Sequence, residues 1–146
     1  MRYIVPLGRV LFAAIFVLAP FSHFAPATVG YAVQAGVPFP KLLVPLSGLV
    51  AFAGGLSVLL GYRARIGAWL LVLFLVPVTL YMHRFWGVPD PMMANLQLAF
   101  FMKNVSMLGT ALVITQLGAG PVSLDAGRSG ASYGAKNSPN WGAPAA

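Results

Sequence analysis

Residues 66–82 read IGAWLLVLFLVPVTLYM, an apolar run without a charged side chain. A helix rises ~1.5 Å per residue and the hydrocarbon core of a bilayer is ~30 Å thick, so roughly 20 mostly apolar residues cross it. Three further runs of this kind lie at about 5–24, 42–60 and 93–117. The sequence therefore predicts an all-α integral membrane protein, in which residues 1–118 form an antiparallel bundle of four transmembrane helices.

The composition of the chain identifies its surroundings. Apolar residues make up 59% of the 146 residues and charged residues 8%, whereas about a quarter of a soluble domain is charged. Nine Lys and Arg residues stand against two acidic ones, but they lie singly at the ends of apolar runs rather than clustered on one face. The lipid bilayer is therefore the expected partner, and nucleic acid is not.

The residues that are missing limit the chemistry. The chain has no cysteine, which excludes disulfides, thiolate nucleophiles and iron–sulfur clusters. Both acidic residues are aspartates, so acid–base chemistry would depend on two Asp, two His and a few Tyr, Lys and Arg. No catalytic residue is assigned, and the question of enzymatic activity leans towards none for this chain alone.

The segments between and after the apolar runs are rich in turn-forming residues. Residues 25–41 are punctuated by Pro and Gly and predict a loop, in which Tyr31 could belong to a short interfacial piece. Residues 119–146 are rich in Gly, Ser and Pro and predict a flexible cytoplasmic tail, which a partner could bind through Trp141. The first run could alternatively be a signal peptide, but it is longer than the usual apolar region of one.

The distribution of basic residues predicts the orientation. With four crossings, one side of the membrane holds Arg2, Arg9, Arg63, Arg65, Arg128 and Lys136, and the other holds Lys41, Arg84 and Asp90. Loops that are rich in Lys and Arg stay in the cytoplasm. We therefore expect a multi-pass membrane protein with both termini in the cytoplasm.

Small residues on the second run predict a close helix contact. Ser47, Ala51 and Gly55 are spaced by four residues, and Gly48 and Gly54 lie beside them. Such residues allow helix backbones to approach closely inside lipid. We expect this face to pack against a neighbouring helix.

Lys103 is the most conspicuous polar residue of the fourth run. A charged side chain within a span costs a few kcal/mol unless it is paired, faces a cavity or reaches the interface. Either Lys103 extends towards the outer interface, or Lys103 and Asn104 point into the bundle and bind a quinone oxygen or an anionic head group. The residues alone leave both interpretations open.

Two histidines close the first and third runs at the same side of the membrane. His23 and His83 could ligate haem, or form an iron site with Asp90. Interfacial histidines that only form hydrogen bonds are more common than ligands, so neither metal nor haem is expected.

Aromatic residues surround His83. Tyr81, Phe85 and Trp86 are typical of the aromatic belt at a membrane interface, and alternatively they form the wall of a pocket. The candidate pocket for a quinone or an anionic ligand therefore consists of His23, Tyr81, His83, Trp86, Lys103 and Asn104. Towards the cytoplasm, Arg9 is expected to anchor its helix at the lipid surface and Asp125 to be solvated.

Several short segments together resemble the DoxX family. They are Val29-Gly30-Tyr31-Ala32, Gly36-Val37-Pro38, Gly54-Gly55-Leu56, Met82-His83-Arg84-Phe85-Trp86, Phe101-Met102-Lys103-Asn104 and the segment from Gly118 to Asp125. The resemblance implies a four-helix protein of the bacterial inner membrane, related to subunits of thiosulfate:quinone oxidoreductases. Many members carry an acidic residue just before the paired glycines, where this chain has Ala51-Phe52-Ala53.

Three functions follow as expectations from this resemblance and from the scarcity of acid–base residues. The first is a non-catalytic accessory subunit of a membrane redox or respiratory assembly, bound to other membrane subunits through its tail. The second is a quinone-linked oxidoreductase subunit with an outer quinone pocket. The third is a small transporter or lipid-handling protein. No cofactor is certain, and quinone is the one that the pocket could bind.

Overall fold

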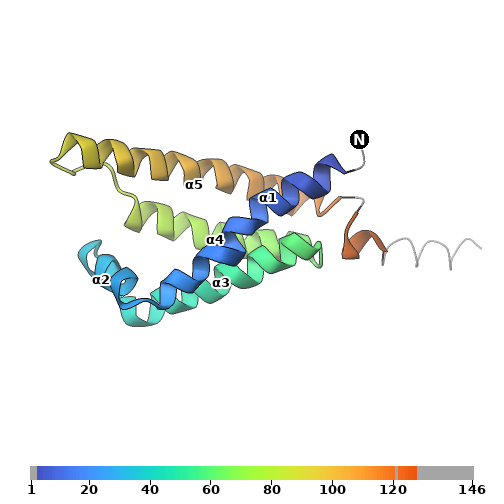
Figure 1. The fold of residues 1–146 in the computed structure, drawn as a ribbon, viewed down its shortest axis with the longest axis horizontal. Coiled ribbons are helices and arrows are strands. Elements are labelled where there is room, and N and C mark those ends of the chain that lie inside the picture. Colours follow the sequence, from blue (N-terminus) through green and yellow to red (C-terminus); the bar gives the residue numbers. More distant parts are fainter. Residues whose placement is uncertain (1–2, 121, 128–146) are drawn as a thin grey trace, which may run out of the picture.

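The computed structural model describes residues 3–120 and 122–127, and all of the regular structure in this part of the chain is helical (Figure 1). The elements in order are α1 (Ile4–Leu18), the 3₁₀ helix η1 (Ala19–Phe24), α2 (Pro26–Gln34), α3 (Pro40–Leu60), α4 (Ala64–Met82) and α5 (Pro91–Leu117). Residues 128–146, which include most of the predicted tail and Trp141, lie outside the described residues.

Four helical segments are long and apolar enough to cross a membrane. They are α1 continued by η1 (Ile4–Phe24), α3, α4 and α5, with mean hydropathies between 1.5 and 2.2. The predicted fold class, an all-α membrane protein with four transmembrane helices, is confirmed. The chain is a multi-pass membrane protein.

Two local features differ from the sequence-based expectation. The first span is not one continuous α-helix, because Pro20 lacks the N–H that would bond to the preceding turn, and the chain tightens into η1 at this point. The expected loop at 25–41 contains α2, because Pro26 stands in the first turn, where a proline needs no hydrogen-bond partner. Gly36, at φ +76°, then follows the end of α2.

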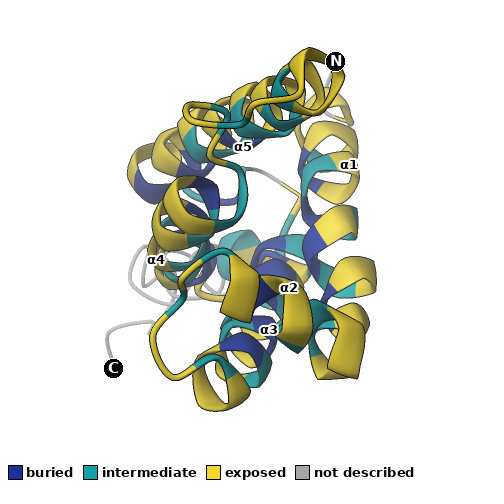
Figure 2. Ribbon diagram, turned by 90° about the vertical axis from the view of Figure 1, so that its left-hand side faces the viewer, coloured by how far each residue is buried: buried dark blue, intermediate teal, exposed yellow. Residues whose placement is uncertain are grey.

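The four long helices pack in the order α1, α3, α4, α5. Figure 2 views the bundle from the end that carries α2. It shows α1, α3, α4 and α5 following one another around the bundle, with α2 in front of α3. The buried core joins residues of all four helices, among them Phe16 on α1, Val58 on α3, Leu71 on α4 and Ile114 on α5. Most other large apolar side chains are exposed, as expected for a protein surrounded by hydrocarbon.

The glycines of α3 face two different neighbours. A Cβ atom placed on Gly54 would lie 2.8 Å from the carbonyl oxygen of Gly67 on α4. A Cβ on Gly55 would lie 2.7 Å from Cβ of Phe16 on α1, and one on Gly48 would lie 2.8 Å from Cβ of His23. The small residues therefore allow α3 to approach α4 on one side and α1 with η1 on the other.

The turn between α3 and α4 is completed by the segment that follows α5. Gly61 adopts φ +64°, and the amides of Gly61 and Tyr62 bond back to Val58 and Ser57, as in a Schellman motif. The carboxylate of Asp125 then accepts hydrogen bonds from the amides of Arg63 (2.8 Å) and Ala64 (3.0 Å) at the start of α4. The expectation that Asp125 is simply solvated is wrong, because it caps a helix that has no capping side chain of its own.

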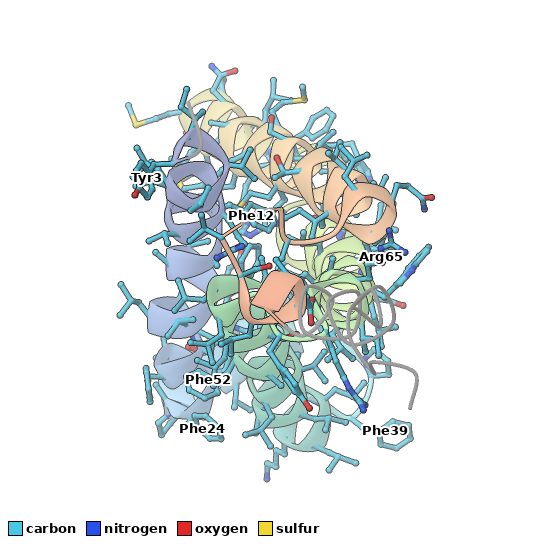
Figure 3. The ribbon with its side chains drawn as sticks, turned by 90° about the vertical axis from the view of Figure 1, so that its right-hand side faces the viewer. Tyr3, Phe12, Phe24, Phe39, Phe52 and Arg65 are labelled. Atoms are coloured by element: carbon cyan, nitrogen blue, oxygen red, sulfur yellow. The ribbon has the colours of Figure 1, made fainter. Side chains whose placement is uncertain are left out.

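Arg9 is bound by the same segment. Its side chain is buried and donates hydrogen bonds to the carbonyl oxygens of Ala119 and Val122, the latter at 2.9 Å. Figure 3, seen from this end, shows the segment after α5 crossing between α1 and the α3–α4 pair, while Tyr3, Phe24 and Phe39 point outward. Arg9 therefore turns into the bundle instead of anchoring α1 at the lipid surface, because two unpaired carbonyls lie within its reach.

Candidate functional site

Two adjoining cavities lie towards the end of the bundle that carries α2. The first, which we call the lysine cavity, has a volume of about 190 Å³ and lies between α1–η1 and α5 against α3 and α4. The second, the α2 groove, has a volume of about 530 Å³ and lies beneath α2 between η1, α3 and α4. The two share four lining residues, which are His23, Phe74, Val78 and His83.

His23 is held in place by the packing of η1 on α3. The absence of a side chain at Gly48 lets η1 approach, and Nδ1 of His23 lies 3.0 Å from Oγ of Ser47 and 3.3 Å from the carbonyl oxygen of Val44. Because the Ser47 hydroxyl donates to Val44, Nδ1 of His23 acts as the donor. The neutral ring then keeps Nε2 as an acceptor.

His83 is positioned by a chain of hydrogen bonds that joins α2, α4 and α5. Its Nδ1 lies 3.1 Å from Oε1 of Gln97, the amide of Gln97 donates to the hydroxyl of Tyr31 (2.8 Å), and Tyr31 donates to the carbonyl oxygen of Met82 (3.0 Å). Burial lowers the pKa of His83 below its usual value, the hydrogen bond to Gln97 opposes this shift, and the charge of Lys103 adds to it. His83 therefore favours its neutral form.

Lys103 and Asn104 reach the lysine cavity from α5. Lys103 lies twelve residues after Pro91, which places its Cα ~18 Å along a helix of ~40 Å. Its ammonium stands 5.1 Å from the ring centroid of Phe100, one turn nearer the start of α5. The side chain thus lines the cavity, as expected if it points into the bundle. It also leans towards the α2 end, as expected if it extends towards the outer interface.

Asn104 is the most enclosed polar group of the site. Its relative exposure is 4%, and it lines the lysine cavity. No hydrogen bond to its side chain is formed by any residue within 3–120 or 122–127. The carboxamide is not among the fully enclosed polar atoms that lack a partner, so it keeps accessible surface towards the cavity, where a ligand can bond to it.

The two predicted aromatic residues are placed differently. Tyr81 lines the α2 groove. Trp86 lines neither cavity; it is half exposed and packs edge-on against Phe85 and Phe101, at centroid distances of 5.1 and 5.9 Å. Trp86 is therefore corrected to a residue outside the pocket, because the turn after α4 directs it onto α5.

A metal site finds no support in the geometry. Within the described ranges, no three His or Asp side chains are grouped closely enough to hold a metal ion. Asp90, the acid that could have joined the two histidines, instead caps α5 by accepting from the amide of Met93 at 2.7 Å. His23 and His83 both line the wall that the two cavities share.

Sequence reasoning missed three residues of the site. Tyr31 and Gln97 fix His83, and Ser47 fixes His23. A usable signal was present for Gln97, because a polar side chain inside an apolar run is costly unless it forms a hydrogen bond. No comparable signal marks Tyr31, which reaches Gln97 and Met82 only because α2 folds over the groove.

Comparison with known proteins decides the family. The model of the SURF4 family matches residues 38–129. The chain belongs to the SURF4 family. It is 26% identical over 125 residues to the inner membrane protein YphA of Escherichia coli (strain K12), covering 82% of this chain and 86% of YphA.

A second SURF4-family relative is longer than this chain. The Surfeit locus protein 4 homolog of Drosophila melanogaster is 37% identical over 70 residues, which cover 47% of this chain but only 26% of the fly protein. No solved structure matches.

The resemblance to the DoxX family is wrong, and the function expected from it is wrong as well. The family model identifies SURF4, and neither relative is named as a redox or respiratory subunit. The segments that suggested DoxX include the paired glycines at which α3 meets its neighbours and the aromatic residues after α4, and they do not decide the family.

Proposed function

We propose that this SURF4-family protein binds a small amphipathic molecule, with the polar end of the ligand in the lysine cavity and its apolar body in the α2 groove. The observation that carries the proposal is Asn104, a residue that is 4% exposed, lines the lysine cavity and forms no side-chain hydrogen bond within the described residues. A ligand atom in the cavity could form with this group the hydrogen bond that the described residues do not supply.

The shape and lining of the α2 groove suit an apolar body. Its volume of about 530 Å³ lies within the ~300–1,000 Å³ range of small-molecule sites. Most of its lining side chains are aliphatic or aromatic, including Leu43, Leu46, Val50 and Leu73. The histidines His23 and His83 lie where the groove meets the lysine cavity, so a ligand in the groove can extend its polar end towards Lys103 and Asn104.

Photolabelling tests the proposal. The protein in lipid nanodiscs is exposed to dodecanoic acid that carries a diazirine near the end of its chain, and the adducts are mapped by mass spectrometry. We expect adducts at Leu43, Leu46 and Val50 in the groove in excess over Leu80, which is exposed on α4 and does not line it. Labelling that followed lipid exposure alone would refute the site.

Two pairs of variants supply matched controls. Val78→Phe places a ring at the junction of the two cavities, and Val76→Phe adds the same ring at an exposed position two residues away. Asn104→Leu removes the carboxamide from the cavity, and Asn95→Leu removes one from an exposed position on the same helix. We expect loss of groove labelling only for the first member of each pair, by about five- to tenfold for Asn104→Leu if one hydrogen bond of about 1 kcal/mol is lost.

The location of the protein is proposed on two grounds. YphA is named as an inner membrane protein, and the end of the bundle that holds Arg63 and Arg65 is the more basic one. We infer that the chain lies in a bacterial inner membrane with both termini in the cytoplasm. Fusions of green fluorescent protein and of alkaline phosphatase to the C-terminus test the topology: fluorescence is expected from the first, and phosphatase activity from the second would reverse it.

A further inference from the structure

Within residues 3–120 and 122–127, no acidic side chain pairs with the charge of Lys103. The sequence contains two acidic residues, and both already serve as caps of helices. Asp90 binds the amide of Met93 at the start of α5, and Asp125 binds the amides that start α4. No carboxylate of Asp or Glu is left that could pair with an ammonium group in the lysine cavity.

The other groups at the cavity do not supply a negative charge either. His23 and His83 each use Nδ1 as a donor and carry no negative charge, and Asn104 is uncharged. Phe100 contributes only the negative face of its ring, at 5.1 Å from the ammonium. The polar wall of the lysine cavity therefore carries the positive charge of Lys103, an exposed residue that also lines the cavity, and this charge attracts an anion.

We infer that the site selects amphiphiles whose head group is an anion of the carboxylate or phosphate class, with Lys103 as its counter-charge and the carboxamide of Asn104 as a hydrogen-bond donor. This inference rests on the proposed function, since it names the head group of the ligand that the two cavities hold. Asn104 and Lys103 are adjacent on α5 and both line the lysine cavity, so one head group can contact both.

A matched set of ligands tests the head group. Dodecanoate, dodecyl phosphate, dodecanol and dodecyltrimethylammonium share one chain length and differ in charge, and each competes against the diazirine-bearing dodecanoic acid for labelling of the α2 groove. We expect the two anions to displace the label at concentrations at least tenfold lower than dodecanol, and the cation to be the weakest. Equal potency of all four would overturn the inference and leave the binding function standing.

Variants of Lys103 separate the site from the membrane surface. Lys103→Gln should abolish the preference for anions, and Lys103→Arg should retain it because the charge remains. Lys41→Gln, at the start of α3, removes the same surface charge and does not line either cavity, so it should keep the preference. A preference that persisted in Lys103→Gln, or was lost equally in Lys41→Gln, would refute the role of Lys103.

Two further conditions identify the source of the anion. Phosphatidylglycerol is substituted for phosphatidylcholine in the nanodiscs, and in a separate arm inorganic phosphate is added to the buffer. Competition by phosphatidylglycerol supports a membrane lipid as the source, whereas competition by inorganic phosphate alone supports a soluble anion. If the probe labels no groove residue in the wild type under any condition, the binding function itself fails before the head group is in question.

Discussion

The contact between α3 and α4 at Gly54 and Gly67 yields a sharp test of the fold. In Gly54→Ala the new methyl carbon would lie 2.8 Å from the carbonyl oxygen of Gly67 and 2.9 Å from Cδ2 of Leu71. The oxygen belongs to the backbone of α4, so it can recede to the 3.4 Å of an ordinary contact only if the helices separate. A separation of about 0.5–1 Å forfeits a quarter to a half of the dispersion energy of each contact along the interface.

The expected loss combines two opposing terms. Overpacking of this kind costs about 1–3 kcal/mol. Alanine in place of glycine within a helix returns about 1 kcal/mol through its higher helix propensity. We therefore expect Gly54→Ala to lower the free energy of unfolding by up to about 2 kcal/mol.

Gly109→Ala isolates the steric part. Gly109 lies inside α5, and a Cβ placed on it has no neighbour within 4 Å, so this variant receives the propensity gain alone. Unfolding by sodium dodecyl sulfate in mixed micelles, followed by far-ultraviolet circular dichroism, should place the two variants about 1–3 kcal/mol apart. Equal stabilities would show that α3 and α4 are not in backbone contact at Gly54, and the reasoning would be refuted.

Three further predictions concern the ends of the bundle. Asp125→Ala should lower the free energy of unfolding by about 0.5–2 kcal/mol because α4 loses its cap, with Asp125→Asn milder; an unchanged unfolding midpoint for Asp125→Ala in the same titration would contradict the capping role. Arg9→Met should release residues 122–127, so amide hydrogen exchange measured by mass spectrometry should accelerate there but not in α2, and wild-type protection in the variant would count against the contact. Because burial lowers the pKa of His83, the unfolded state takes up its proton first as the pH falls, so stability should decline from about pH 6.5 downward until the lowered folded pKa is passed. His83→Gln should flatten this decline, and an equally steep decline in the variant would assign the effect to other groups.

The membrane helices were predictable because one physical requirement sets them. An apolar run must cover the thickness of the hydrocarbon core, and the runs at 42–60 and 66–82 begin within two residues of the helices Pro40–Leu60 and Ala64–Met82. The break at Pro20 and the helix α2 were missed for a different reason. Both depend on how a proline fits its own turn, which average hydropathy does not register.

The candidate site was only partly predictable. Spans of alternating direction bring His23 and His83 to the same end, and both residues line the two cavities. The failure at Trp86 and the omission of Tyr31 have the same cause, since the turns after α4 and before α3 decide which aromatic side chain faces the groove. Turn geometry of this kind is set by tertiary contacts and does not follow from residue types in a row.

The contacts of Arg9 and Asp125 could not be predicted at all. Arg9 binds the carbonyl of Ala119, which lies 110 residues further along the chain. Asp125 caps a helix that starts 61 residues before it. A backbone carbonyl carries no signature of its residue type, so nothing in the sequence indicates that an arginine on α1 will find one there.

The long reach of Arg9 bears on how the protein is made. A ribosome adds about 5–20 residues per second, so roughly 5–20 s separate the synthesis of Arg9 from that of its acceptor at Ala119. During this interval the first helix must enter the translocation machinery while its guanidinium lacks its final acceptors. The insertion of α1 is therefore separate in time from the formation of the Arg9 contacts. We expect a nascent chain halted before residue 119 to remain bound to an insertase or a chaperone.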